Sequence, residues 1–171
     1  MYRILEYFIL FAVVILLQVF VFDSLQTGRY FTPFVYPAFV ILLPMEISGW
    51  LLLLLAAATG VTMDVFMGTP ALNTIATVFL AFCRPGVLKL FVEKDVLDEG
   101  GIPNIARLGT ARFIRYSTAL LLLFNAVFFV LETMTLTGIG YTLLRIVLST
   151  AASAAVVYFC QLLFVIHKSK I

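Results

Sequence analysis

Three ionisable side chains interrupt otherwise apolar stretches of the chain, and their positions make them the first candidates for chemistry. Asp64, Glu132 and Arg145 each lie within or near the end of a long apolar run. A charge inside a bilayer is costly, so such a residue is a functional candidate by default. We expect Arg145 to pair with Asp64, with Glu132 or with both, because an opposite charge lowers the cost of burial. The alternative is that each charge reaches water at the end of its span, which fits Glu132 best.

The residues around Asp64 form a second pattern. Gly60 lies four residues before Asp64 and shares its helix face, and a small residue there lets a neighbouring helix approach closely. Gly68 and Pro70 mark a tight turn, and Pro70 suits the first turn of the next helix. Asn73 then begins a small or polar stripe and is placed to hydrogen-bond near Asp64. The pattern predicts a close helical hairpin, for which helix packing alone is the plainer interpretation.

Motifs for catalysis and cofactor binding are missing from the sequence. It contains no Gly-x-Ser-x-Gly, no His-Glu-x-x-His and no phosphate-binding glycine loop. Cys83 and Cys160 form no Cys-x-x-Cys motif, and His167 is the only histidine, so neither a zinc site nor a disulfide framework is expected. The net charge of +2 implies no basic surface for nucleic acid. We therefore expect no enzyme, no metal and no cofactor.

Membrane-spanning helices are the elements that must position these residues. Apolar residues make up 63% of the chain and charged residues only 12%, whereas a soluble domain has about half and about a quarter. A spanning helix needs about 20 apolar residues, and the apolar segments cover residues 4–22, 31–45, 47–66, 70–90, 116–136 and 141–166. We expect an all-α integral membrane protein: a compact bundle of six transmembrane helices that forms one domain over residues 1–171.

The segment 31–45 is the doubtful span, because it is short and carries Pro33, Pro37 and Pro44. Loops rich in Lys and Arg stay in the cytoplasm, and this rule favours six spans. Six spans put both termini and the loop 91–115 on the cytoplasmic side, together with the basic residues Arg3, Arg84, Lys89, Lys94, Arg107, Arg112, Arg115, Lys168 and Lys170. Only Arg29 would then lie in an outer loop.

The last apolar segment contains an unbroken run of small residues, from Ser149 to Ala155. Helices associate within lipid where small side chains allow close contact. The run could serve packing inside the bundle or the docking of a partner helix, and the sequence leaves both open.

The hairpin resembles one known family. Gly60, Asp64, Gly68 and Pro70 match a Gly-x-x-x-Asp-x-x-x-Gly-x-Pro pattern typical of the rod shape-determining protein MreD family, and the layout of the whole chain is similar to it. The pair Arg84–Pro85 resembles the version found in Bacteroidetes. Leu72 departs from the pattern, because many relatives have a glycine shortly after the proline.

The resemblance implies a non-catalytic scaffold subunit of the bacterial cell-elongation complex, which controls rod shape and lateral peptidoglycan synthesis. The implied partners are MreC, through it MreB, and a RodA-type glycosyltransferase with its penicillin-binding protein, all at the bacterial inner (cytoplasmic) membrane. Structural or partner-coupling roles would then fall to the candidate residues Asp64, Arg145, Glu132, Asn73, Gly60, Gly68 and Pro70.

The fold implied by the resemblance is similar to the six-helix substrate-binding components of ECF-type vitamin transporters. It provides the alternative hypothesis of a small-molecule-binding subunit of a transporter. That hypothesis predicts a polar cavity near the outer face, lined by Asp64, Asn73, Glu132 and Arg145. Few polar residues line the spans and no internal repeat is evident, so the scaffold hypothesis is favoured.

Overall fold

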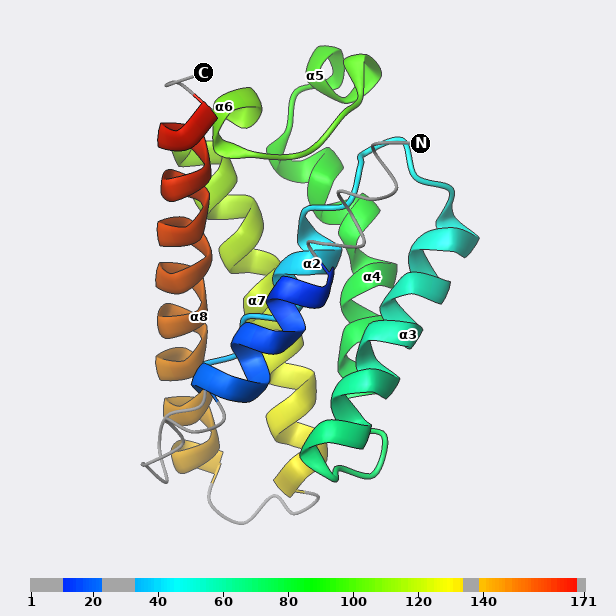
Figure 1. Ribbon diagram of the computed structural model, residues 1–171, viewed down its shortest axis with the longest axis vertical. Coiled ribbons are helices and arrows are strands. Elements are labelled where there is room, and N and C mark those ends of the chain that lie inside the picture. Colours follow the sequence, from blue (N-terminus) through cyan, green and yellow to red (C-terminus); the bar gives the residue numbers. More distant parts are fainter. Residues whose placement is uncertain (1–10, 23–32, 134–138, 169–171) are drawn as a thin grey trace.

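The structure, a computed structural model, describes residues 11–22, 33–133 and 139–168, and every regular element in these ranges is a helix. The first helix is described from residue 11 and ends in a π-helical stretch, η1 (Gln18–Phe22). The following elements are α2 (Pro37–Ile41), α3 (Gly49–Met67), α4 (Leu72–Phe91), α5 (Lys94–Glu99), α6 (Ile105–Leu108), α7 (Thr110–Thr133) and α8 (Ile139–Lys168) (Figure 1).

Four of these helices, α3, α4, α7 and α8, are long and apolar enough to cross a membrane. They correspond to the last four predicted spans within a few residues at most ends. The largest difference is that α7 begins at Thr110, six residues before the predicted residue 116 and inside the predicted loop 91–115. The prediction of an all-helical fold is therefore confirmed for the described part of the chain, and its four long apolar helices are consistent with a membrane protein. The first helix is described only from residue 11, so part of the predicted span 4–22 lies outside the described residues.

The four long helices form one layer in chain order. Helix α3 packs against α4, α4 against α7, and α7 against α8, which leaves α3 and α8 at opposite edges (Figure 1). The first helix and α2 cover one face of this layer, and α2 contacts both α4 and α7. The short helices α5 and α6 lie at the end of the bundle where α8 finishes (Figure 1).

The segment 33–45 differs most from its prediction as a spanning helix. Only Pro37–Ile41 is α-helical, although every residue from 33 to 43 is buried. Proline explains this, because Pro37 starts a helix but Pro33 and Pro44 cannot donate the backbone hydrogen bonds that would extend it. The segment therefore crosses the interior with many backbone groups unpaired by secondary structure.

Side chains from two other helices satisfy the extended start of this segment. Gln18 of η1 donates through Nε2 to the carbonyl of Pro33 at 3.2 Å and accepts from the amide of Val35 at 2.6 Å. Ser153 of α8 accepts from the amide of Phe34 at 2.9 Å. Unpaired backbone groups at membrane depth are tolerated only where protein surrounds and satisfies them. The small residues of α8 thus serve packing inside the bundle at Ser153.

A cluster of aromatic rings fills the space between the segment and α7. The ring of Phe34 lies 4.7 Å from that of Phe128 and 5.4 Å from that of Phe124, measured between centroids. Tyr36 packs edge-on against Phe124 at 5.5 Å. Edge-to-face and tilted pairs at these distances are favourable beyond their burial alone, so the cluster fixes the segment against α7.

Gly60 sets the spacing between α3 and α4. A Cβ atom at Gly60 would lie 2.4 Å from Thr74 Cα and 3.0 Å from the carbonyl oxygen of Asn73, both of which are backbone atoms. The predicted close approach at this glycine is therefore confirmed. By contrast, a Cβ atom at Gly86 in α4 would meet nothing within 4 Å.

Gly60→Ala should lower the free energy of unfolding by about 1–3 kcal/mol or more, since the overpacked helices must move apart. Gly86→Ala is the matched control, because it adds the same methyl group to open space. It should be neutral or stabilise by up to about 1 kcal/mol, the difference in helix propensity. Chemical unfolding of both variants in the same detergent measures the two effects. Equal effects would mean that Gly60 does not set the spacing.

Candidate functional site

Asp64 lies in the last turns of α3, where the chain reverses into α4. Helix α3 ends at Gly68, whose positive φ of 65° suits a residue without a side chain. Oδ1 of Asp64 accepts from Thr69 Oγ1 at 2.5 Å, from the Asn73 amide at 2.9 Å and from Asn73 Nδ2 at 3.0 Å. Oδ2 accepts from the amide of Thr74 at 2.9 Å and from its Oγ1 at 2.6 Å.

This carboxylate caps α4 from the neighbouring helix. The amides of Asn73 and Thr74 belong to the first turn of α4, where they have no acceptor within the helix. A negative charge there also interacts favourably with the helix dipole. Five donors thus stabilise Asp64 without an arginine, and the structure gives Asp64 no ion pair with any described residue. The predicted hydrogen bond between Asn73 and Asp64 is confirmed.

The turn itself differs in one detail from the prediction. Pro70 is exposed and lies before α4, which begins at Leu72, so it does not occupy the first helical turn. The residue between them, Ala71, has a φ of 61°. A left-handed conformation costs an alanine about 1–2 kcal/mol, and the hydrogen bonds around Asp64 hold the turn in that conformation.

Asn73 extends the network from the hairpin to the buried segment. Its Oδ1 accepts a hydrogen bond from Tyr36 Oη at 2.7 Å, and its carbonyl accepts from Thr77 Oγ1 at 2.6 Å. Tyr36 directly precedes α2 and is fully buried. Asp64 therefore fixes Asn73, and Asn73 fixes the start of α2.

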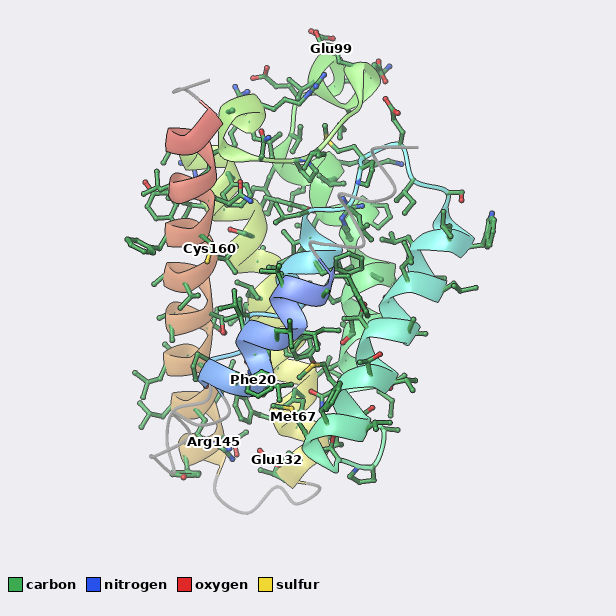
Figure 2. All side chains as sticks on the ribbon, viewed as in Figure 1. Phe20, Met67, Glu99, Glu132, Arg145 and Cys160 are labelled. Carbon is green, nitrogen blue, oxygen red and sulfur yellow. The ribbon has the colours of Figure 1, made fainter. Side chains whose placement is uncertain are left out.

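Arg145 pairs with Glu132, one of the two partners that the sequence left open. Arg145 Nη1 lies 2.9 Å from Glu132 Oε2, joining the start of α8 to the end of α7. The guanidinium carbon lies 4.4 Å from the centroid of the Phe129 ring, within range of a cation–π interaction. Figure 2 shows Arg145 and Glu132 together at the end of the bundle opposite Glu99. Glu132 is partly exposed, so it also reaches solvent.

Asp64 and Arg145 belong to separate groups, so of the two partners left open for Arg145 the structure shows Glu132 and gives no pair with Asp64. Aromatic rings lie between the groups: Phe129 contacts Phe34 at 6.2 Å, and Phe34 contacts Tyr36 at 6.1 Å, between centroids. Each group is bonded internally. Among the described side chains, the four residues expected to line one polar cavity therefore form two separate pairs. Similar depth along the bundle did not bring the charges together.

The burial of Arg84 is not predicted from the sequence, which groups it with the cations of the cytoplasmic side. Only 1% of it is exposed, and it points into the bundle from α4. The signal was its spacing, since Arg84 continues the buried stripe of Asn73, Thr77 and Ala81. A residue that shares the face of a buried stripe is expected to be buried as well.

Backbone carbonyls and a tyrosine solvate this buried cation. Its Nη2 donates to the carbonyl of Leu43, its Nη1 to that of Pro44 at 3.4 Å, and its Nε to Tyr116 Oη at 3.0 Å. Tyr116 Oη in turn donates to the carbonyl of Ile41 at 3.0 Å. The carbonyls of Ile41 and Leu43 lie at the end of α2, where helical partners are missing, whereas the carbonyl of Pro44 also accepts from the amide of Ile47 at 3.4 Å. Arg84 and Tyr116 therefore cap α2.

No family model, curated protein or solved structure matches this chain. The geometry of the side chains must then carry the functional argument. Within the ranges 11–22, 33–133 and 139–168, no group of three or more His, Cys, Asp or Glu residues could hold a metal ion. The carboxylate of Asp64 and the guanidinium of Arg84 both point at backbone and side-chain partners inside the bundle, which is the arrangement of a structural role.

Substitution of the buried Arg84 and the half-buried Arg145 should separate their contributions to the free energy of unfolding. Arg84→Met removes the donor for the buried carbonyl of Leu43, and a buried unpaired group costs about 1–3 kcal/mol. Arg145→Met removes a partly solvated pair, worth about 1 kcal/mol or less. Unfolding of the two variants in one detergent should show the larger loss for Arg84→Met. A larger loss for Arg145→Met would contradict the capping role of Arg84.

Asp64→Asn should weaken the hairpin, because an NH2 group replaces one of the two carboxylate oxygens, and in the place of Oδ2 it cannot accept the two hydrogen bonds from Thr74. Each buried donor left without an acceptor costs about 1–3 kcal/mol, so the free energy of unfolding should fall by that order. Asp98→Asn, on the exposed side of α5, is the matched control and should leave it unchanged. Indistinguishable unfolding curves for the two variants would rule out Asp64 as the cap of α4.

Proposed function

We propose that the chain is a non-catalytic scaffold subunit of the bacterial cell-elongation complex, similar in role to the MreD family. The observation that carries the proposal is the Gly60–Asp64–Gly68–Pro70 hairpin. Its one charge is used to fix α3 against α4, and its glycine permits backbone contact between them. A hairpin with this sequence pattern and this rigidity suits a subunit that positions other proteins.

The distribution of side chains on α8 supports a docking role for this helix. In the small-residue run, Ser149, Thr150 and Ser153 face the bundle and are buried. Ala151 and Ala155 face outward and are exposed. We propose that the two uses that the sequence left open are divided between two faces of this helix. The inner face serves packing, and in our proposal the alanine face receives a partner helix, since small residues favour close helix contact in lipid.

Six crossings are part of the proposal. The first helix and the segment 33–45 would add two crossings to α3, α4, α7 and α8, and Figure 1 supports this by the path of the chain. The segment 33–45 rises toward the end where α5 and α6 lie, and α3 then runs away from that end. With this count both termini face the cytoplasm of the bacterial inner membrane, and the fold would be similar to that of the ECF-type substrate-binding components.

The alternative role, a small-molecule-binding subunit of a transporter, lacks a supporting observation in the described residues. It requires one polar cavity lined by Asp64, Asn73, Glu132 and Arg145. The rings of Phe34 and Phe129 lie between these two pairs instead. The scaffold role needs no such cavity.

Affinity purification of the tagged full-length chain from native membranes, in a mild detergent, tests the proposal. We expect an MreC protein to be recovered, together with a RodA-type glycosyltransferase or its penicillin-binding partner. An unrelated multi-span protein with the same tag, purified in parallel, is the control for nonspecific membrane contacts. Recovery of an ATPase pair and a bound small molecule in place of these proteins would establish the transporter role instead.

A further inference from the structure

We infer that the buried segment 33–45 couples the two ends of the bundle. The α3–α4 turn and the loop that holds α5 and α6 lie at opposite ends of the long helices (Figure 1). A continuous series of hydrogen bonds connects them through this segment. The coupling belongs to the chain itself and holds whether or not the proposed partners bind.

The series begins at the α3–α4 turn. Asp64 holds Asn73 by its amide and its side chain, and Asn73 Oδ1 accepts from Tyr36 Oη at 2.7 Å. Tyr36 is fully buried, so its hydroxyl has no contact with bulk solvent. The start of α2 is therefore positioned by a carboxylate on the neighbouring hairpin.

The middle of the series is α2 itself. All of its residues, from Pro37 to Ile41, are buried. Pro37 fixes its own backbone dihedral φ at the first helical position, and aromatic rings from the first helix and α7 enclose the turn through Phe11 and Phe124. Protein interiors are close-packed and transmit displacement, so α2 moves as one body.

The series ends at the loop between α4 and α7. Tyr116 and Arg84 hold the carbonyls of Ile41, Leu43 and Pro44. The next residue, Met45, donates its amide to the carbonyl of Gly101 at 2.8 Å. Gly101 follows Gly100, at which a Cβ atom would lie 1.5 Å from Glu46 Oε1. The loop is thus held directly against the end of the segment.

Two ion pairs join parts of this loop to each other and to the start of α7. Arg107 pairs with Glu99 at 3.3 Å, and Arg112 of α7 pairs with Glu93. Asn104 also caps α6 by accepting from the amide of Arg107 at 2.9 Å. A shift of Met45 is therefore passed to a structured loop.

The coupling follows from the cost of unpaired groups in the interior. If the hydrogen bond of Tyr36 is lost, Asn73 Oδ1 has no donor from the segment, and the start of α2 is free to shift. Hydrogen bonds in a medium of low dielectric are strong, and a buried group without its partner is costly. A shifted α2 would lengthen the bonds to Arg84, Tyr116 and Gly101, so the loop loses order as well.

Two single-hydroxyl deletions test the coupling from both ends. Tyr36→Phe and Tyr116→Phe each keep the ring and remove one hydroxyl, so the packing is preserved. Hydrogen–deuterium exchange of the full chain in lipid nanodiscs is the measurement. Tyr36→Phe should accelerate exchange of the loop amides at residues 97–109 by about fivefold or more, the lower range of measured couplings between sites. Tyr116→Phe should accelerate exchange at Asn73 and Thr74, since coupling between two sites is reciprocal.

Tyr158→Phe is the matched control, because it also removes one tyrosine hydroxyl but Tyr158 lies on α8 and is not a member of the series. It should change neither the loop nor the α3–α4 turn. Glu132→Gln breaks the pair at the far end of α7 without touching the series, and it should also leave loop exchange unchanged. Acceleration confined to the mutated end, or equal acceleration by Tyr158→Phe, overturns the coupling.

Discussion

The structure depends on one constraint: a backbone amide or carbonyl at membrane depth needs a partner inside the protein. Long helices meet this requirement by themselves, but the segment 33–45 does not. Its backbone is satisfied by side chains from four helices, namely Gln18, Arg84, Tyr116 and Ser153. Several buried polar side chains of the described bundle, including the large Arg84 and Tyr116, are therefore placed where a mostly non-helical segment needs them. The layer α3–α4–α7–α8 provides the frame from which three of them reach it.

The two most deeply placed charges bind helix ends in preference to each other. Asp64 accepts the free amides that begin α4, and Arg84 donates to the free carbonyls that follow α2. Each sign of charge meets the end of the backbone that complements it. Arg145 and Glu132 instead pair with each other, and they do so where the bundle meets its surroundings. Intramembrane charge is thus used here mainly to end helices and join them.

Sequence reasoning predicted the four long helices and the hairpin well, because apolar length and a Gly–Asp–Gly–Pro pattern are local signals. It failed where the direction in which a side chain points around its helix axis decides which neighbours it meets. Asp64 and Arg145 share a depth but face different neighbours, and depth alone is what a linear topology provides. Arg84 was assigned by its place along the chain, although its spacing from Asn73 and Thr77 put it on the buried face. The short helix inside 33–45 was not predicted, because the apolar composition of the segment resembles that of a spanning helix even where prolines prevent a continuous helix.

The partners of the segment 33–45 have a consequence for biosynthesis. Phe34 is bonded to Ser153, which the ribosome adds more than one hundred residues later, and Arg84 and Tyr116 also follow the segment in the chain. When residues 33–45 are made, Gln18 already exists, but the other three side chains that will satisfy their backbone do not. Unsatisfied backbone groups are costly in lipid. The segment can therefore reach its final packing only after α8 has been made, so that synthesis and folding of this protein follow different orders along the chain.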